Sequence, residues 1–343
     1  AGCGHPAVQI WTNQAALAPA VQRFNAEQDE YRAELRYENA LYTAVRLAET
    51  PPDLVVGSAI GALHQEFRSL DELVDGNPLS TDAFYQAQLR ALRRAGKLKL
   101  LPVSFNLPMM LFREGDLQST HGTVLDPAAV HKLSMEYRQE TEGRLTALGY
   151  SPRWNLDFAY TVLRVFGVGF EETVESLSWD RGRLEQAVSW LAGWGDGSDA
   201  WLQREETFRR RYLYEPAAKL IRSGRIRFAY EESNRFFSSP EEQTRGLAFR
   251  WLGAVGSIPV LDNQTLLGIP LRADNVPGAR AFVAWLLQET TQETLLALTT
   301  RTNAPGFGVV GGFSALRNVN EEVLPRYYPE LIGVMPSSPW LSF

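Results

Sequence analysis

Residues 100–112, LLPVSFNLPMMLF, form the most apolar run in the chain and restrict its possible folds more than any other segment. A single buried strand explains this run poorly, because proline cannot donate to a strand ladder and is confined to sheet edges, strand starts and bulges. Pro102 and Pro108 nevertheless interrupt the run, and Ser104 and Asn106 stand between them. The segment is therefore not expected to cross one sheet as one buried strand.

The N-terminal part of the chain alternates strand and helix patterns. Residues 7–12 and 33–38 read as strands, and residues 54–56 read as a short buried strand after two prolines. Apolar residues at three- and four-residue spacing over 17–28 predict an amphipathic helix, and a second helical segment is expected over 40–50. This order predicts right-handed crossover units and a parallel sheet.

Length and charge limit the class of protein. A chain of 343 residues suggests two domains, and a hydrophobic content of 45% is ordinary for a globular protein. The net charge of -6 argues against a nucleic-acid partner that is bound through phosphate neutralisation. No segment reaches the roughly 18 consecutive apolar residues of a membrane-spanning helix.

Motifs for catalysis, metals and cofactors are missing from the sequence. The four histidines show no metal-ligand spacing, so no metal and no cofactor are expected. Gly306, Gly308 and Gly311 match G-x-G-x-x-G, but no strand-to-helix context surrounds them, and they are read as a loop. Glu231 and Glu232 are adjacent, and adjacent residues of a strand point to opposite faces. The sequence therefore favours a protein that is not an enzyme.

The single cysteine, Cys3, lies at the start of the given sequence, within Ala1-Gly2-Cys3-Gly4. Bacterial lipoprotein signals end in small residues before a cysteine that becomes lipidated, and AGC looks like the end of such a signal. The alternative is a free thiol on a disordered terminus. We expect lipidation of Cys3 and a periplasmic or other extracytoplasmic location, with the protein anchored to the membrane through its N-terminus.

Aromatic residues are numerous, with 9 Trp, 12 Tyr and 17 Phe, and several stand beside small polar residues. Flat aromatic faces next to amides and carboxylates suit a sugar ring and its hydroxyl groups. In open α/β sheets, ligands bind beyond the carboxyl ends of strands, where residues 11–13, 57–58 and 231–233 are expected. Trp190 and Trp194 lie on apolar helix faces and are expected in the core.

Several segments, in order and nearly end to end, resemble the extracellular solute-binding proteins of ABC importers, family 1, the maltose-binding-protein-like sugar-binding lipoproteins. They are AGC, IWTNQ, RFNAEQ, PPDLVVG, LLPVSFNLPMMLFREGD, SGRIRFAYEES and GIPLRADNVPGARAFVAWLLQETTQETLL. The resemblance implies an α/β protein with the two-lobe periplasmic-binding-protein fold of type II. Each lobe would be a mainly parallel sheet flanked by helices, and hinge motion would close the lobes over a ligand in the cleft between them.

The same resemblance implies the boundaries of the lobes. The N-terminal lobe would hold residues 1–105 and 264–302, and the C-terminal lobe residues 106–263 and 303–343. Residues 100–112 would then be a crossing, ending one strand in the first lobe and starting another in the second. The closed form would dock on the permease subunits in the membrane as a monomer.

The resemblance also implies which residues of this chain contact the ligand. They would come from the ends of strands, from the crossing and from the rim of the second lobe. The expected ligand-binding residues are Trp11, Thr12, Asn13, Tyr42, Ser58, Asn106, Trp154, Glu231, Ser233 and Trp251.

Three alternatives to sugar capture remain open. The basic run over 204–227 could bind a phosphorylated polyol such as glycerol phosphate, although interleaved glutamates favour a solvated helix face. Glu231 or Glu232 could serve a carbohydrate-active enzyme. An anchored surface protein acting as an adhesin is the third alternative.

Overall fold

The computed structural model describes residues 7–74, 78–117, 122–172, 176–302 and 306–343. The chain divides into two compact units, which are described separately. Unit 1 contains the chain up to Asn106, Leu261–Ser338 and Phe343, and unit 2 contains Leu107–Val260 and Pro339–Ser342. Cys3 lies outside the described residues.

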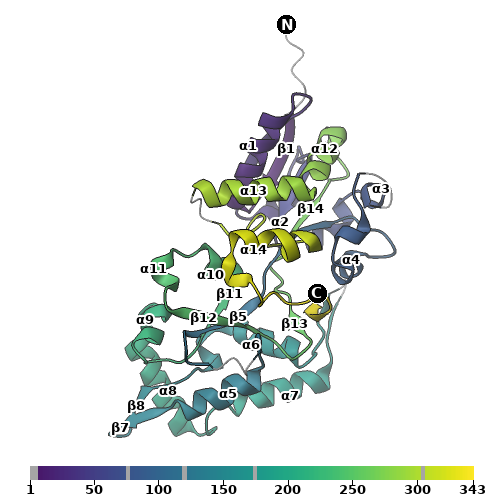
Figure 1. Cartoon of the computed structure of the whole chain (residues 1–343). Helices are drawn as coiled ribbons and strands as arrows, with labels where there is room; N and C mark the ends of the chain where they lie inside the picture. Colours follow the sequence, from purple (N-terminus) through teal and green to yellow (C-terminus); the bar gives the residue numbers. More distant parts are fainter. Residues whose placement is uncertain (1–6, 75–77, 118–121, 173–175, 303–305) are drawn as a thin grey trace. The chain divides into compact units, whose positions relative to one another are not determined.

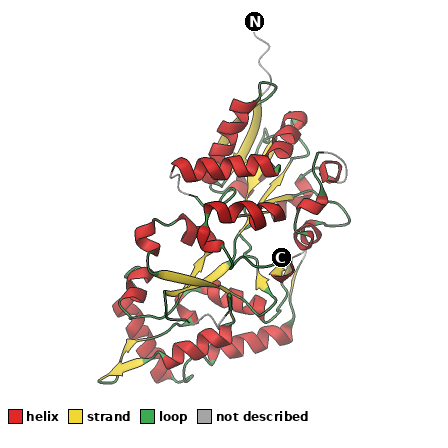
Figure 2. Cartoon of the chain, in the orientation of Figure 1, coloured by secondary structure: helices red, strands yellow, loops and turns green. Residues whose placement is uncertain are grey.

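Unit 1 is an α/β unit whose strands and helices are labelled in Figure 1 and coloured by type in Figure 2. Its strands are β1 (Ala7–Thr12), β2 (Arg32–Tyr37), β3 (Leu54–Gly57), β4 (Leu101–Phe105), β14 (Thr265–Gly268) and β15 (Phe313–Ser314). Its α-helices are α1 (Ala18–Glu27), α2 (Leu41–Leu47), α3 (Asp71–Val74), α4 (Gln86–Leu92), α12 (Val276–Leu286), α13 (Glu289–Thr302) and α14 (Leu324–Tyr327).

The six strands of unit 1 form one mixed sheet in the order β15-β4-β14-β3-β1-β2. The pairs β1–β2 and β1–β3 are parallel, as the alternation of strands and helices predicts. The pairs β3–β14, β14–β4 and β4–β15 are antiparallel. The expected mainly parallel sheet is therefore wrong for this half of the sheet, because β14 and β15 come from returning segments that run against β3 and β4.

Helices cover both faces of this sheet. Phe24 of α1 packs edge-on against Phe282 and Trp285 of α12, with ring centroids 5.0 and 5.3 Å apart. On the other face, Trp11 of β1 packs with Leu41 and Val45 of α2. The alternation of side chains along a strand explains this division, because neighbouring strand residues face opposite sides.

A buried carboxylate joins the sheet of unit 1 to helix α12. Asp53, which is 4% exposed, accepts hydrogen bonds from the backbone N–H of Gln9 (2.8 Å) and of Asn275 (2.6 Å). The side chain of Asn275 caps α12 by accepting from the N–H of Gly278 at 3.0 Å. Asp53 therefore fixes the start of α12 against β1 and satisfies backbone donors that would otherwise be buried without a partner.

The apolar run 100–112 is two strands in two units, and the prediction of a crossing is confirmed. Strand β4 belongs to the sheet of unit 1, whereas β5 (Pro108–Arg113) pairs with strands of unit 2. The chain passes from one unit to the other after Asn106. Pro108 stands at the first position of β5, where a missing N–H costs least.

Unit 2 contains four short sheets surrounded by helices (Figures 1 and 2). Its strands are β5, β6 (Val124–Leu125), β7 (Gln139–Thr141), β8 (Arg144–Ala147), β9 (Glu171–Glu172), β10 (Leu177–Ser178), β11 (Ala229–Glu232), β12 (Leu247–Leu252), β13 (Ile258–Pro259) and β16 (Leu341–Ser342). Its α-helices are α5 (Pro127–Glu136), α6 (Leu156–Val165), α7 (Arg181–Ala192), α8 (Asp199–Tyr212), α9 (Ala217–Arg222), α10 (Ser233–Ser238) and α11 (Glu241–Thr244).

The central sheet of unit 2 has the order β11-β5-β12-β6 and is also mixed. Only the pair β6–β12 is parallel, and β5 runs antiparallel to both β11 and β12. One face carries an aromatic core that includes Phe112, Tyr150, Phe158, Trp194 and Phe228. The predicted core position of Trp194 is confirmed, since this side chain is 4% exposed.

The C-terminal part of the chain belongs mainly to unit 1, so the expected assignment of residues 303–343 to the second lobe is wrong over most of its length. Strand β15 pairs with β4, and Asn320 donates to the Ser314 carbonyl (2.7 Å) and to the Tyr85 hydroxyl (3.0 Å). These buried contacts hold the returning segment in unit 1. Only Pro339–Ser342 lies in unit 2, where β16 pairs with β13.

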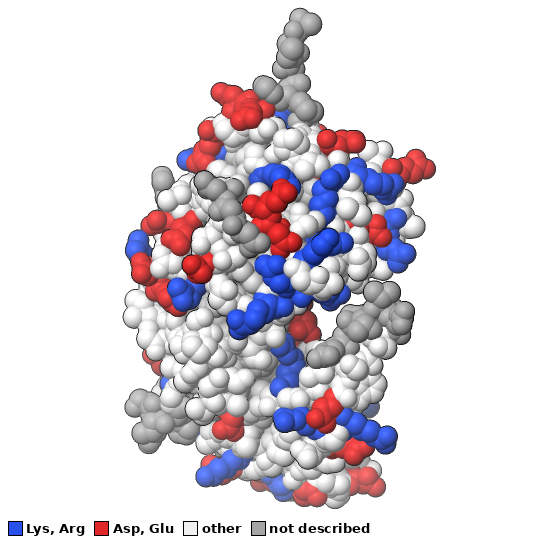
Figure 3. All heavy atoms as spheres, turned by 90° about the vertical axis from the view of Figure 1, so that its right-hand side faces the viewer, with Lys and Arg blue, Asp and Glu red and all other residues white. Residues whose placement is uncertain are grey.

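On the face drawn in Figure 3, basic side chains gather in the upper and middle part of the view, with acidic side chains beside them. Several acidic and basic side chains of unit 1 form ion pairs, such as Arg280 with Glu72 at 3.0 Å and Arg93 with Asp71 at 2.9 Å. None of the described helices has the length and the apolar character that crossing a membrane requires.

Candidate functional site

The parallel strands of unit 1 bring three chain segments to one edge of the sheet. Strands β1, β2 and β3 are neighbours and run in the same direction, so their carboxyl ends, at Thr12, Tyr37 and Gly57, meet at that edge. Tyr37 is 56% exposed there. This edge is where ligands bind in open α/β sheets.

Asn13, Gln14 and Ser58 form a polar cluster at this edge, which we call the unit 1 edge cluster. The side-chain oxygen of Asn13 accepts from the N–H of Ser58 at 3.0 Å, and its Nδ2 donates to the Ser58 carbonyl at 3.2 Å. Gln14 donates through Nε2 to Asn13 Oδ1 and to Ser58 Oγ, both at 3.3 Å. The structure thus brings together Asn13 and Ser58, two of the predicted residues, although 45 positions separate them.

Two hydrogen-bonding groups of this cluster have no partner in the described chain and could bind a ligand. Ser58 Oγ accepts from Asn13 Nδ2 (3.3 Å) and from Gln14 Nε2 (3.3 Å), so both of its acceptor positions are used. Within the described chain, neither the Ser58 hydroxyl proton nor Gln14 Oε1 has a hydrogen-bond partner. The cluster therefore offers one donor and one acceptor from half-buried side chains, while Asn13 holds both in place.

Two backbone features at this edge, a close approach at Gly57 and a positive φ at Ala59, are typical of functional sites. A Cβ on Gly57 would lie 2.4 Å from Asn13 Oδ1 and 2.5 Å from Leu41 Cδ2, so only glycine leaves room for the Asn13 amide. Ala59 has a φ of 59°, which is costly for a residue with a side chain. Such strain is retained where the surrounding structure, and often a function, requires it.

Three other predicted residues of unit 1 have structural partners at the same edge. Trp11 is 7% exposed, and the guanidinium of Arg36 lies 4.4 Å from its ring centroid. Thr12 is fully buried, and its hydroxyl accepts from the N–H of Gln14 at 2.9 Å, which shapes the turn after β1. Tyr42 is 37% exposed and accepts from Arg46 at 2.9 Å. Of these three, only Tyr42 presents a large accessible surface.

The crossing residues hold a glycine-rich loop. Asn106 is 5% exposed and donates to the Gly311 carbonyl at 3.1 Å, and buried Ser104 donates to the Val310 carbonyl at 3.2 Å. A Cβ on Gly308 would lie 2.0 Å from the Gly312 carbonyl oxygen, so the loop closes tightly. The expectation that Asn106 contacts a ligand is not supported, because its amide satisfies this loop. The G-x-G-x-x-G segment is a loop, as predicted.

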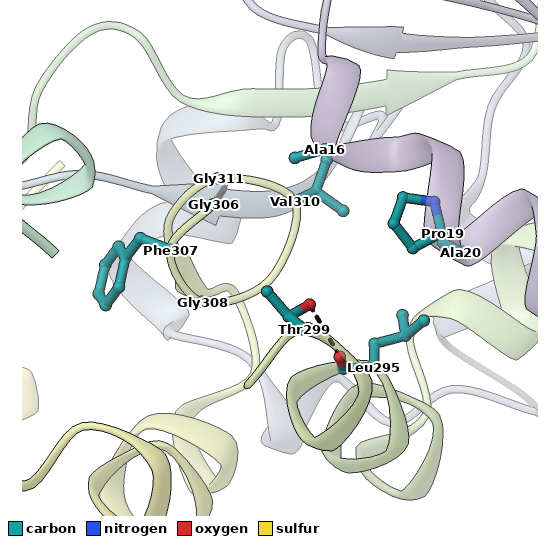
Figure 4. A pocket seen from close by; sticks show the side chains of 10 residues that line it. All are labelled: Ala16, Pro19, Ala20, Leu295, Thr299, Gly306, Phe307, Gly308, Val310 and Gly311. Atoms are coloured by element: carbon teal, nitrogen blue, oxygen red, sulfur yellow. Dashed lines mark hydrogen bonds between the residues drawn. The ribbon is translucent and has the colours of Figure 1, made fainter. Parts of the chain in front are cut away.

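The same loop borders a small hollow in unit 1 (Figure 4). Ala16, Pro19, Leu295 and Phe307 are among the residues that line it, and its volume is about 30 Å³. This volume holds about one or two water molecules, and no sugar ring fits it. The hollow is therefore excluded as the ligand site.

In unit 2, strand register places Glu231 and Trp251 on one face of the central sheet. Both pair with Met109 of β5, from β11 on one side and β12 on the other. Glu231 is half-buried, whereas Trp251 has no exposed surface and packs edge-on against Phe249 at 5.0 Å. Trp251 is therefore a core residue, and the expectation that it contacts a ligand is not supported.

Ser233 and Trp154 also have structural partners. Ser233 is fully buried, and it exchanges two hydrogen bonds with the backbone of Leu107, at 3.0 and 3.1 Å, where the chain enters unit 2. Trp154 stacks on Phe208 with centroids 5.9 Å apart and packs against the aromatic core. That core lies on the sheet face opposite Glu231, so the structure does not bring Trp154 and Glu231 together.

Among the predicted ligand-binding residues of unit 2, Glu231 is the one that combines a charged side chain with exposure to solvent. Burial raises the pKa of its carboxyl, and the N–H of Glu232, which donates to Glu231 Oε1 at 3.1 Å, and the charge of Arg235 oppose this shift. Tyr230, its neighbour on β11, is buried on the other face, and its hydroxyl lies 3.5 Å from that of Thr161. Burial raises the Tyr230 pKa as well.

The Glu231→Gln variant is expected to change how stability depends on pH. A raised pKa means that the folded protein binds the proton more tightly than the unfolded chain, so stability falls as pH rises from below 4.5 through the folded-state pKa. Glu231→Gln removes this fall, so the variant gains stability relative to the wild type between pH 4 and pH 7, measurable by urea unfolding at both pH values. Glu241 is exposed, and Glu241→Gln is the matched control. If stability depends on pH in the same way in the wild type and in Glu231→Gln, the raised pKa of the Glu231 carboxyl is contradicted.

Within the described part of the chain, no three histidine, cysteine, aspartate or glutamate side chains lie close enough to bind a metal ion. The residues that sequence reasoning missed are Gln14 and Ala59. Gln14 is the last letter of IWTNQ, and it could have been found from its place after a strand end. The strained φ of Ala59 leaves no signal in a sequence.

Comparisons with known proteins give similarity at the level of structure only. No protein-family model matches the chain, and no curated protein matches it. CpMnBP1 with mannobiose bound has a TM-score of 0.65 and 15% identity, and the match covers 96% of this chain and 87% of that one. The substrate-binding protein Lmo0181 from Listeria monocytogenes in complex with cycloalternan has a TM-score of 0.63 and 13% identity, with 98% and 87% covered.

These matches extend over nearly the whole chain. At this level of identity they establish the architecture and leave the ligand open. The described chain therefore has the fold of the ABC substrate-binding proteins.

Proposed function

We propose that this protein is the substrate-binding component of an ABC importer that captures a small carbohydrate and delivers it to membrane permease subunits. The observation that carries the proposal is the match over nearly the whole chain to structures of CpMnBP1 with mannobiose and with mannotriose and of Lmo0181 with cycloalternan. The unit 1 edge cluster supports it, because a hydroxyl donor beside an amide acceptor suits the hydroxyl groups of a sugar.

The proposal includes a site, a location and a mode of action. Ser58 and Gln14 would contact the sugar from unit 1, with Asn13 positioning them, and Tyr42 would offer an aromatic face. Glu231 of unit 2 stays a prediction from the sequence. The protein would act outside the cytoplasm as a monomer, and lipidation of Cys3 stays a prediction from the sequence. No bond of the ligand would change, so the protein would not be an enzyme.

The phosphorylated polyol is less well supported, because most of the arginines over 204–227 have structural partners. Arg209 and Arg210 pair with Glu206 at 2.8 and 2.7 Å. Arg222 donates to the Arg245 carbonyl at 2.7 Å, and Arg227 to the Asp116 carbonyl at 3.2 Å. Most of these guanidinium groups are therefore not available to grip a phosphate.

The proposal is tested by titrating the purified protein with mannobiose, mannotriose, cycloalternan, the common mono- and disaccharides, and glycerol phosphate. We expect saturable one-to-one binding of at least one carbohydrate by calorimetry, with a matching rise in melting temperature. The recovered ligand is expected to be chemically unchanged after prolonged incubation. Absence of heat and of a melting shift across all carbohydrates would refute carbohydrate capture, and release of shorter sugars would show an enzyme instead.

A further inference from the structure

A second cavity lies within unit 2 and has no part in the proposed carbohydrate site. It is bounded by the β7–β8 hairpin on one side and by helix α8 on the other, and we call it the hairpin pocket. Its volume is about 370 Å³, which lies within the roughly 300–1,000 Å³ typical of small-molecule sites. The residues that line it include Leu145, Phe208, Arg144, Arg204 and Arg211.

The pocket has an apolar base. Phe208 is 1% exposed and Leu145 is 5% exposed, so both present only a small part of their surface to the pocket. Phe208 is held between two aromatic rings, stacked on Trp154 at 5.9 Å and tilted against Tyr212 at 5.0 Å. These contacts fix the Phe208 ring, so the base is already formed without a ligand.

The rim of the pocket is basic. Three arginines line it, and no carboxylate does. Arg204 is neutralised by Glu140 at 3.1 Å and by Asp196 at 3.4 Å. Arg144 and Arg211 are exposed and, among the residues that the structure describes, neither has a carboxylate partner.

We propose that the hairpin pocket binds a small organic anion, such as an aromatic carboxylate. The organic body would lie in the cavity between the hairpin and α8, and the guanidinium groups of Arg144 and Arg211 would pair with its charged group, a contact that arginine makes well. The inference does not depend on the proposed carbohydrate function, because none of its residues belongs to that site.

The test uses 2-naphthoate as the probe and uncharged 2-naphthamide, which has the same shape, as its control. Calorimetry with the full chain is expected to show saturable binding of 2-naphthoate and at least tenfold weaker binding of 2-naphthamide. The affinity for 2-naphthoate is also expected to fall as salt is raised, because exposed charges are screened. Equal binding of the two probes, or no saturation by 2-naphthoate, would overturn the proposal.

The double variant Arg144→Ala/Arg211→Ala tests the residues themselves, and both are exposed, so the fold is expected to persist. It should lose at least tenfold in affinity for 2-naphthoate and keep its carbohydrate binding unchanged. The matched control Arg209→Ala/Arg210→Ala also removes two positive charges from unit 2, yet these arginines pair with Glu206 and do not line the pocket. Undiminished binding in the first double variant, or an equal loss in the control, would refute the assignment.

Discussion

Replacing Gly57 by Ala is expected to lower the affinity for the carbohydrate proposed as the ligand at least tenfold, which corresponds to about 1.4 kcal/mol. The added Cβ would lie 2.4 Å from Asn13 Oδ1, closer than any stable contact, so the Asn13 amide must move. Because Asn13 fixes Ser58 through hydrogen bonds of 3.0 and 3.2 Å, its displacement also releases the hydroxyl group proposed to contact the sugar. Titration calorimetry at a temperature where both proteins are folded measures the effect.

Gly61 provides a matched control for this substitution. It lies four residues further along in the same unit, and a Cβ built there meets nothing within 4 Å. Gly61→Ala is therefore expected to bind as the wild type does. Ser58→Ala, which removes the hydroxyl without introducing a clash, is expected to weaken binding in the same direction. Wild-type affinity in Gly57→Ala would show that the unit 1 edge cluster does not bind the ligand.

Asp53→Ala is expected to lower the free energy of unfolding of unit 1 by about 3 kcal/mol. The substitution leaves the N–H groups of Gln9 and Asn275 buried without an acceptor, after hydrogen bonds of 2.8 and 2.6 Å to a charged group are lost. Hydrogen bonds to charged groups contribute about 1.5–3 kcal/mol each, and an unsatisfied buried donor adds a desolvation cost. Chemical unfolding followed by tryptophan fluorescence gives the value, with Trp11 and Trp285 as probes within unit 1.

Two further variants make this result interpretable. Asp29 is exposed, so Asp29→Ala is expected to change stability by less than about 0.5 kcal/mol. Asp53→Asn keeps one acceptor and places an amide N–H against the other donor. Its free energy of unfolding is therefore expected to lie between those of the wild type and of Asp53→Ala. If Asp53→Ala unfolds at the same denaturant concentration as Asp29→Ala, the carboxylate does not hold α12 in place.

Local patterns in the sequence predicted much of unit 1. The alternation of strands and helices over the first part of the chain predicted the parallel pairs β1–β2 and β1–β3, which the structure contains. The two prolines of residues 100–112 excluded a single buried strand, and the chain does divide there between β4 and β5. These features depend on side-chain period and on proline geometry, which are local properties of a sequence.

The mixed character of the sheets could not be predicted in the same way. Strands β14 and β15 join the sheet of unit 1 from the far end of the chain, and their direction depends on which neighbour they meet. The membership of residues 306–338 in unit 1 depends likewise on contacts such as that between Asn320 and Tyr85, 235 positions apart. Such pairings are chosen by burial and hydrogen bonding across the fold, and no short pattern in the sequence encodes them.

Sequence alone determined which types of residue stand at strand ends: Asn13 and Ser58 in one unit, Glu231 and Ser233 in the other. Which of them keep a free hydrogen-bonding group depends on contacts between parts of the chain that are distant in sequence. The Ser58 hydroxyl only accepts hydrogen bonds within the described chain, whereas Ser233 bonds to the backbone of Leu107 and Asn106 to that of Gly311. The physical reason is that buried backbone groups must be satisfied, and folding gives them the nearest polar side chains before any ligand arrives.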